Sequence, residues 1–438
     1  MGDKGARPFN TSMSKLNFET TKIGIIGLGY VGLPLAIEFG AKWETIGFDI
    51  DSSRIQELKN SFDRTAEILQ DGFESSSFID FTDSLDALQH CNIFIITVPT
   101  PIDENNLPAL DAIKNATKSV CSLLKKGDIV IYESTVYPGL TEEVCVPMLE
   151  QSGLTLNNDF YCGYSPERIN PGDSQHRLKD IVKVVSGSCQ EALVDINALY
   201  LSIIDAGTHM AESIKVAEAA KVIENTQRDL NIALVNEFAI IFNKLGLDTQ
   251  SVLNASNTKW NFLDFRPGLV GGHCIGVDPY YLTYKSKEAG YIPEIILAGR
   301  KLNNSMPAYV AQHVADSFSA KSLSHENKTV LILGFTFKEN CPDIRNTKIF
   351  DLYRSLGDLN MIADVFDPIA NNDEIKKTYG INSLLNKPSQ KYDAVILAVP
   401  HIYFLEMGLI EIKKFCSEDN NFFDLKSVYQ LSDSTFRL

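Results

Sequence analysis

The sequence predicts an α/β protein with two Rossmann-like, doubly wound domains joined by a helical domain with a long central helix. Three observations predict this class. Short apolar runs alternate with helical stretches from Lys22 to about Asp205, and a second alternating stretch begins at Thr329. Between them, residues 212–245 contain neither Gly nor Pro. The expected segments are a disordered lead-in over 1–20, a first Rossmann domain over 21–205, a helical central domain over 206–322 and a second Rossmann-like domain over 323–438.

The first predicted strand, residues 22–26, leads into a glycine-rich turn and then into a helical stretch from Leu33 to Ala41. Such a turn lets a pyrophosphate approach the backbone and rest on the helix N-terminus, where amide donors and the helix dipole favour negative charge. The alternative is an ordinary tight turn in a parallel-sheet protein. The expected cofactor-binding positions of the turn are Gly27, Gly29, Tyr30, Val31 and Gly32.

A second strand, residues 45–49, ends in Asp49, twenty positions after Gly29. This is where the ribose diol of a dinucleotide is expected to bind. Because an acid at this position repels a 2′-phosphate, we predict NAD rather than NADP as the cofactor of the first domain. Arg54 is also placed in the cofactor site, where it either partners a phosphate or lines the adenine pocket.

Three further apolar runs predict strands at residues 92–98, 128–132 and 181–185. The first two run into polar turns that contain Thr100 and Thr135. Because ligands bind at the carboxyl ends of parallel strands, both threonines are candidates to contact the cofactor or the reacting group. The alternative is that they only satisfy the local backbone of their turns.

Residues 212–245 are rich in Ala, Glu, Lys, Ile and Leu and predict one helix of about 50 Å. Its apolar residues cover more than one face, so we expect it to join two domains and to pack against a second subunit. Lys221 and Asn225 lie one turn apart on the same face, with Arg228 three residues further on. A solvated strip with an incidental lysine is the alternative for these three residues.

The segment 271–279 offers one cysteine, Cys274, among small residues, with the carboxylate of Asp278 four positions later. A thiolate forms thiohemiacetals and thioesters readily, and paired glycines let a substrate come close to the backbone. The segment therefore predicts a covalent catalyst. A small buried hydrophobic residue is the alternative for this cysteine.

The second alternating stretch predicts strands within residues 329–338, 363–368 and 393–400. It has only Gly334 where a dinucleotide turn needs three glycines, and Lys338 and Arg345 follow. Such a turn suits a nucleotide diphosphate better than a second dinucleotide. The alternative is a structural domain with surface charges.

The formal charge of −16 argues against nucleic acid or an anionic membrane as a partner. The eight cysteines have neither CxxC nor metal-type spacing, which predicts a reducing cytoplasm and no metal site. No apolar run approaches the ~18 residues of a membrane span.

With these pieces in order, the chain resembles the nucleotide-sugar 6-dehydrogenases, the UDP-glucose, GDP-mannose and UDP-N-acetylhexosamine dehydrogenase family. The motifs that carry the resemblance are the N-terminal glycine turn, Glu133-Ser134-Thr135, Ser165-Pro166-Glu167-Arg168, Lys221 with Asn225, Gly271-Gly272-His273-Cys274 with Asp278, and Thr336-Phe337-Lys338 through Asp343 and Arg345. The resemblance implies a homodimer through the long helix and a UDP-sugar in the C-terminal domain. It also implies oxidation of a sugar C6 alcohol to a carboxylate with two NAD and one water.

The resemblance also implies roles for single residues. Lys221, close to Asn225 and Asp278, would assist proton removal from the alcohol. Cys274 would attack the aldehyde, and Glu167 would be the acid/base of thioester hydrolysis. Thr135 and Asp278 would hold the water. The matching substrate-binding positions are Arg168, Ile169, Lys221, Asn225, Arg228, Gly268, Phe337 and Lys338, with Arg266 as a candidate to act across the dimer and Arg345 on the cofactor's side.

His273, the segment 276–281 and the segment 168–172 resemble the branch that acts on UDP-N-acetylhexosamines, whose products feed surface polysaccharides. UDP-N-acetylglucosamine is preferred as substrate, followed by UDP-N-acetylgalactosamine, with UDP-N-acetylmannosamine and UDP-glucose as alternatives. A one-step hydroxyacid or 6-phosphogluconate dehydrogenase would need neither Cys274 nor a second α/β domain. A catalytically silent NAD- or nucleotide-sugar-binding regulator is the rival from another class.

Overall fold

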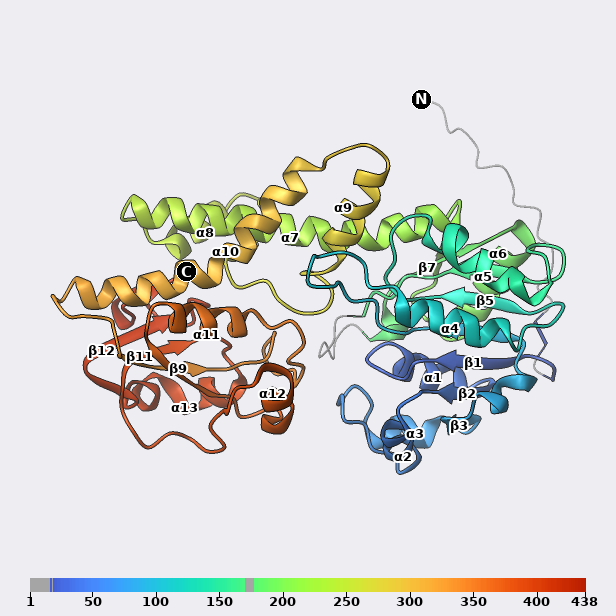
Figure 1. The fold of residues 1–438 in the computed structure, drawn as a ribbon, viewed down its shortest axis with the longest axis horizontal. Coiled ribbons are helices and arrows are strands. Elements are labelled where there is room, and N and C mark those ends of the chain that lie inside the picture. The colour runs from blue at the N-terminus through green and yellow to red at the C-terminus, as the bar shows by residue number, and fades with distance from the viewer. Residues whose placement is uncertain (1–15, 18, 170–176) are drawn as a thin grey trace. The chain divides into compact units, whose positions relative to one another are not determined.

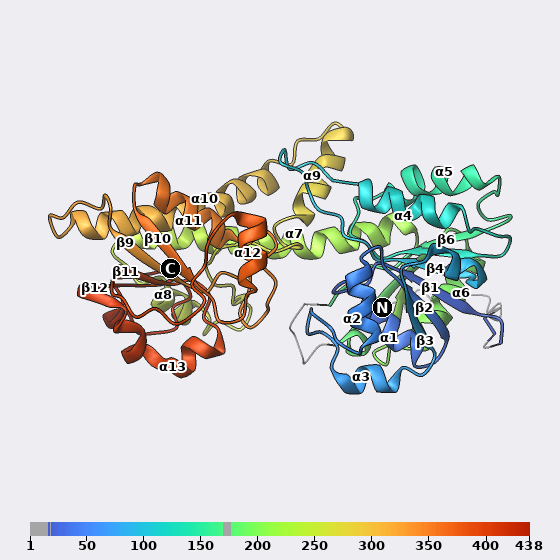
Figure 2. The ribbon, with the colours of Figure 1, turned by 60° about the horizontal axis from the view of Figure 1, so that its bottom comes forward.

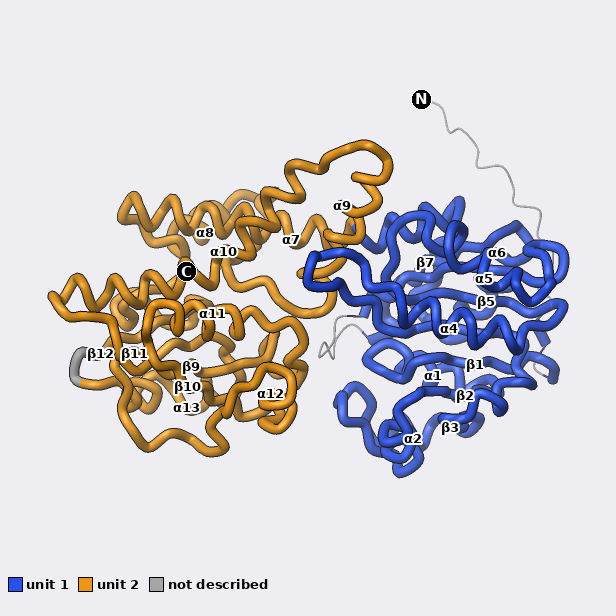
Figure 3. Tube along the Cα trace, viewed as in Figure 1, with its two compact units in different colours: residues 1–222 blue, residues 223–438 orange. Residues whose placement is uncertain are grey.

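The computed structural model describes residues 16–17, 19–169 and 177–438. The lead-in expected over 1–20 therefore falls mostly outside the described residues, as do positions 170–172 of the branch motif. The chain forms two compact units, Met1–Val222 and Ile223–Leu438 (Figure 3). The boundary between them falls inside the long helix α7. The division into three domains stays a prediction.

Unit 1 is built on an eight-stranded sheet with the strand order β3-β2-β1-β4-β5-β6-β7-β8 (Figure 1). Its elements are β1 (Lys22–Ile26), α1 (Gly32–Gly40), β2 (Glu44–Phe48), α2 (Ser52–Lys59), α3 (Gln70–Ser75), β3 (Ile79–Thr82), β4 (Ile93–Ile96), α4 (Asp111–Cys121), β5 (Ile129–Tyr132), α5 (Val146–Leu149), β6 (Tyr161–Tyr164), β7 (Lys183–Gly187), α6 (Gln190–Leu201) and β8 (Thr208–Met210). The order reverses between β1 and β4, which is the switch point where doubly wound sheets bind ligands.

Helices cover both faces of this sheet, as right-handed crossovers on either side of the switch point require. α1 and α6 share one face, where the rings of Phe39 and Tyr200 meet edge to face with centroids 5.7 Å apart. Figure 2 shows α4 and α5 on the other side of the sheet from α1. Both faces of the central strands are therefore buried, and β4 and β5 are apolar at every position.

One feature differs from the expected parallel sheet. β7 pairs with β6 antiparallel, while β8 pairs with β7 in parallel. The apolar run at 181–185 indicates a strand with both faces covered, and such a run carries no information about strand direction. The sheet is therefore mixed at this end, although its central strands are parallel.

The central strands end at one level. Ile26 on β1 lies opposite Ile96 on β4, and Tyr132 on β5 lies opposite Ile96. Tyr164 on β6 in turn lies opposite Tyr132. The turns that follow these four strands consequently open on the same edge of the sheet.

Unit 2 carries a second sheet with the order β10-β9-β11-β12-β13, in which all pairs are parallel. Its elements, with α7 included, are α7 (Ile214–Lys244), α8 (Thr249–Ser256), α9 (Asp278–Glu288), α10 (Glu294–Ser319), β9 (Thr329–Leu333), α11 (Lys348–Asp358), β10 (Ile362–Phe366), α12 (Asn372–Tyr379), β11 (Tyr392–Leu397), α13 (Ile402–Lys413), β12 (Cys416–Asp424) and β13 (Phe436–Arg437). The 31 residues of α7 span about 47 Å, which confirms the helix predicted for 212–245.

Alternate residues of β9 pack on opposite faces of this sheet. Val330 and Ile332 belong to the core formed with α10 and α11. Leu331 and Leu333 belong to the core formed with α13. This alternation is the two-residue period of a strand covered on both sides. None of the helices in the described stretches combines the length and apolar character needed to cross a membrane.

Candidate active site

The glycine turn lies at the carboxyl end of β1. A Cβ atom on Gly32 would lie 1.8 Å from the carbonyl oxygen of Gly27 and 2.4 Å from Thr97 Oγ1, so the start of α1 packs directly on the turn. A Cβ on Gly29, in contrast, would meet no described atom within 4 Å. The backbone at Gly29 therefore faces open space at a helix N-terminus, which fits a pyrophosphate.

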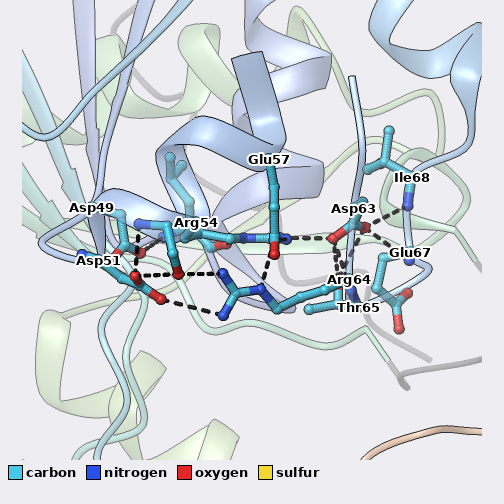
Figure 4. A network of polar contacts seen from close by, with 11 residues as sticks. Asp49, Asp51, Arg54, Glu57, Asp63, Arg64, Thr65, Glu67 and Ile68 are labelled. Atoms are coloured by element: carbon cyan, nitrogen blue, oxygen red, sulfur yellow. Dashed lines mark hydrogen bonds and ion pairs between the residues drawn. The ribbon is translucent and has the colours of Figure 1, made fainter. Parts of the chain in front are cut away.

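Asp49 follows β2 beside this turn (Figure 4). Its carboxylate accepts hydrogen bonds from the amides of Leu28, at 2.8 Å, and Asp51, at 2.9 Å. The acid predicted to bind a ribose diol is thus fixed next to the turn predicted to bind the pyrophosphate. Asp49 and the glycine turn therefore lie next to each other, as a site for a dinucleotide requires.

Arg54 is buried in the polar network of Figure 4. Its Nε donates to the carbonyl oxygen of Leu28 at 3.0 Å, and its Nη2 lies 2.7 Å from Asp63 Oδ1. Burial alone would raise the pKa of Asp63, but hydrogen bonds from Thr65, Arg54 and backbone amides hold it below its usual value. Because Asp63 compensates its charge, Arg54 fits the wall of an adenine pocket better than a phosphate contact.

The polar turns after β4 and β5 lie side by side. Ser134 Oγ donates to the carbonyl oxygen of Val98 at 2.6 Å and so joins the two turns. Thr100 is buried, and Thr135 is half-buried. The structure therefore brings both predicted threonines to the edge of the sheet that carries the glycine turn.

Glu167 follows β6 at the same edge of the sheet and is 6% exposed. Its Oε1 accepts hydrogen bonds from the amides of Arg168, at 2.7 Å, and Ile169. Its Oε2 lies 3.5 Å from Lys183 Nζ and has no hydrogen-bond partner among the described residues. Arg168 Nη1 donates to the carbonyl oxygen of Val182 at 2.8 Å, while Ile169 packs on the core of unit 1.

In unit 2, Cys274 opens the turn that leads into α9. The amides of Val277 and Asp278 donate to its carbonyl oxygen at 3.0 and 2.8 Å. Asp278, the first residue of α9, accepts a hydrogen bond from Asn225 Nδ2 at 2.6 Å, and both side chains are buried. Lys221, one turn before Asn225 on α7, is buried as well. The structure thus joins Asn225 and Asp278, which are 53 positions apart in the sequence.

The cysteine loop is bonded to the segment that follows β9. The amide of Gly272 donates to the carbonyl oxygen of Asn346 at 3.0 Å, and Asn346 Nδ2 donates to the carbonyl oxygen of Gly272 at 2.8 Å. Gly272 has a φ of 83°, and a Cβ there would lie 2.8 Å from the ring of Phe337. Phe337, a predicted substrate contact, therefore lies against the loop that carries Cys274.

Arg345 forms an ion pair with Asp343. Its Nη2 lies 2.6 Å from Asp343 Oδ2, and its Nε bonds both oxygens of that carboxylate at 3.0 Å. His273 Nδ1 lies 3.4 Å from the same Asp343. Burial would lower the pKa of His273, but hydrogen bonds with Asp343 and Cys274 raise it to about 9. The imidazole beside Cys274 is therefore expected to be protonated at neutral pH.

The other predicted substrate positions are spread over unit 2. Gly268 is held by Asn236 through two hydrogen bonds, of 2.8 and 3.0 Å. Arg266 pairs with Asp264 at 2.7 Å. Arg228 is exposed on α7, and Lys338 is half-buried in the turn after β9. The described residues contain no group of three or more His, Cys, Asp or Glu side chains that could hold a metal ion.

Sequence reasoning gave no role to several buried polar residues around these positions, namely Asp63, Glu133, Lys183, Tyr200 and Asn236, although Glu133 was named within a family motif. One signal was present in the sequence. Lys183 interrupts an otherwise apolar strand, and a lysine in a strand covered on both faces needs a buried acid as its partner.

Three models of one family match the chain. They are the NAD binding domain of the UDP-glucose/GDP-mannose dehydrogenase family over residues 21–204, its central domain over 215–305 and its UDP binding domain over 331–431. The chain therefore belongs to the UDP-glucose/GDP-mannose dehydrogenase family. It is an NAD-dependent oxidoreductase of UDP-sugars, and the predicted family, enzyme class and cofactor are confirmed.

Individual relatives match almost the whole chain. The UDP-N-acetyl-D-glucosamine 6-dehydrogenase of Salmonella typhi is 54% identical over 96% of this chain and 99% of its own length. The protein of the same description from Pseudomonas aeruginosa is 54% identical over 95% of this chain and 99% of its own. The solved structure of a UDP-D-ManNAc dehydrogenase from Pyrococcus horikoshii is similar with a TM-score of 0.84 at 27% identity, covering 95% of this chain and 98% of that one.

Proposed function

We propose that this chain oxidises the C6 alcohol of UDP-N-acetylglucosamine to the carboxylate, consuming two NAD and one water, in the synthesis of a surface polysaccharide precursor. The observation that carries the proposal is the 54% identity to UDP-N-acetyl-D-glucosamine 6-dehydrogenases over nearly the full chain. The galacto and manno epimers and UDP-glucose are the alternative substrates.

Bound NAD would accept a hydride from the sugar carbon in each of the two oxidations. Lys221 would assist removal of the hydroxyl proton in the first, and its ammonium would stabilise the developing oxyanion. The Asn225–Asp278 hydrogen bond of 2.6 Å would keep both side chains in fixed positions for this step. Asp49 would bind the adenosine ribose, and the backbone at Gly29 would lie against the pyrophosphate.

Cys274 Sγ would attack the aldehyde carbon to form a thiohemiacetal, and the second oxidation would leave a thioester. Water would then add to the thioester carbonyl, the C–S bond would break, and the carboxylate would leave. Glu167 would take the proton of the water, which Thr135 and Asp278 would hold. Covalent capture of the aldehyde explains why no free aldehyde need be released.

The UDP-sugar would be held by residues of the predicted substrate set. The members proposed to contact its phosphates, ribose or sugar are Arg168, Ile169, Arg228, Gly268, Phe337 and Lys338, with Arg266 acting across a dimer and Arg345 on the cofactor's side. The hydrogen bonds from Asn236 support the Gly268 part of this proposal, because they fix the loop.

A homodimer through α7 is proposed as the working form. Val216, Ile223, Leu234 and Ile241 are 44 to 54% exposed, and their spacings of seven, eleven and seven residues place them on one stripe of the helix. A second copy of the same helix would bury this stripe. All eight cysteines are thiols rather than disulfides, which supports a reducing cytoplasm as the compartment.

The test is the amount of NADH formed when limiting UDP-N-acetylglucosamine is run to completion with excess NAD, repeated with both epimers and UDP-glucose. Two NADH per sugar would support the full oxidation and identify the substrate. One NADH would indicate a dehydrogenase that stops at the carbonyl. No NADH with any sugar would favour a silent binding protein.

A further inference from the structure

Four polar side chains are buried together at the carboxyl ends of β5 and β6. Lys183 Nζ lies 2.6 Å from Glu133 Oε2 and 3.5 Å from Glu167 Oε2, and Lys183 itself is 3% exposed. Tyr200 donates its hydroxyl to the other oxygen of Glu133. One ammonium thus contacts two carboxylates: Glu133 has the shorter contact and a side-chain donor, while Glu167 receives its hydrogen bonds from backbone amides.

A purely structural ion pair would need only one carboxylate to neutralise Lys183, but two carboxylates lie near it here. Among the described residues, the charged or titratable groups that face Glu133 are Lys183 from β7, Tyr200 from α6 and Glu167 from the turn after β6. Burial, opposed by Lys183 and reinforced by Glu167, raises the pKa of Glu133 to about 7. Glu133 therefore changes its charge in the neutral range.

We propose that Lys183 and Glu133 are positioning residues for Glu167: ionised Glu133 engages Lys183 and leaves Glu167 able to accept the proton of the attacking water. The inference rests on the proposed role of Glu167 in thioester hydrolysis. If Glu133 were neutral, Lys183 would attract Glu167 alone and stabilise its ionised form, which makes it a weaker base. Glu167 Oε2, which has no hydrogen-bond partner within the described part of the chain, is the oxygen placed to take the proton.

The step balances in protons and electrons. The water gives its proton to Glu167 as its oxygen adds to the thioester carbonyl. The tetrahedral adduct then collapses, the C–S bond breaks, and Cys274 leaves as a thiolate that recovers a proton from Glu167, while the carboxylic acid formed releases the second proton of the water to solvent. Lys183 stays paired with Glu133 throughout, so no buried charge is left uncompensated.

The first test uses the Glu133→Gln variant. Its kcat is measured as a function of pH, and its NADH formation is followed by rapid mixing. In the wild type we expect kcat to decrease as the pH falls below about 7 (the acid limb), and in Glu133→Gln we expect this decrease to be absent. We also expect kcat of the variant at about pH 8 to be roughly tenfold lower than that of the wild type, because Lys183 then always engages Glu167. Two NADH per active site should form in a burst, since only hydrolysis slows. Glu133→Gln combined with Lys183→Met removes both charges and should restore the rate most of the way to wild type.

Asp128→Asn is the matched control, because Asp128 is a buried acid at the other end of β5 whose pKa burial raises to about 6. It should leave the pH profile unchanged. An unchanged acid limb in Glu133→Gln, or a double variant slower than the single one, would overturn the inference. If Glu133→Gln does not fold, Tyr200→Phe removes the hydroxyl donor to Glu133 and should raise the midpoint of the acid limb.

Glu167→Gln separates this inference from the proposed function. Slow hydrolysis in Glu167→Gln together with a normal Glu133→Gln would refute only the positioning role. Fast hydrolysis in Glu167→Gln would remove the proposed role of Glu167 itself.

Discussion

Two alanine substitutions in the glycine turn are expected to act in opposite ways. In Gly32→Ala the new Cβ would lie 1.8 Å from the carbonyl oxygen of Gly27, a backbone atom that cannot move without opening the turn. Overpacking costs about 1–3 kcal/mol, and a backbone clash belongs at the upper end of that range. At about 2–4 °C per kcal/mol, unfolding of unit 1 should shift down by roughly 6–12 °C.

Gly29→Ala should leave the fold intact, because its Cβ would meet no described atom within 4 Å and Gly29 has no positive φ. The free energy of unfolding should change by less than about 1 kcal/mol. The methyl group would instead occupy the space of the pyrophosphate and weaken NAD binding at least tenfold, or about 1.4 kcal/mol. The expected pattern is a folded protein with weakened cofactor affinity.

The assay is thermal unfolding of both variants with and without NAD, combined with titration calorimetry of NAD. Wild-type affinity in Gly29→Ala would refute the assignment of the pyrophosphate to this turn. Wild-type stability in Gly32→Ala would show that the close contact with Gly27 does not hold in solution.

Three further outcomes are expected. Cys274→Ser should retain NAD binding and lose net turnover, because a hydroxyl is a far weaker nucleophile than a thiolate; near-normal turnover would contradict the covalent mechanism. Asn236→Ala should cost about 1–3 kcal/mol of stability and raise KM for the UDP-sugar, because it leaves Gly268 backbone groups unbonded. Asn231→Ala on the same helix is its control in both measurements, because among the described residues the side-chain amide of Asn231 bonds only a carbonyl of α7. Asp367 should contribute acid sensitivity: burial would raise its pKa, but the hydrogen bond and charge of His401 lower it to about 2. Its contribution of roughly 2 kcal/mol is present above about pH 4 and lost as the pH falls through 2, so acid unfolding of Asp367→Asn should be flatter there.

Much of the fold could be predicted because periodicity and turn chemistry are local. The strand expected at 128–132 is β5, Ile129–Tyr132, and the helix expected at 212–245 is α7, Ile214–Lys244. The direction of β7 could not be predicted, because both faces of that strand are covered whichever way it runs.

The polar partners within the site depend on tertiary contacts that no local pattern encodes. Asp63 follows Arg54 by nine positions through a loop, so neither helical nor strand spacing connects them. Glu133 and Lys183 are fifty positions apart and meet only because β5, β6 and β7 are neighbours in the sheet. The predicted site residues could be recognised from the sequence because each belongs to a short motif of neighbouring residues, such as Gly271-Gly272-His273-Cys274.

Reciprocal hydrogen bonds between Gly272 and Asn346 join the loop that carries Cys274, the proposed nucleophile, to the segment after β9 that is proposed to bind the UDP-sugar. A displacement of Asn346 would therefore be transmitted to Gly272, two residues before Cys274. The position of the Cys274 thiol therefore depends in part on Asn346, and we expect an Asn346 substitution to leave the protein folded but to move the thiol.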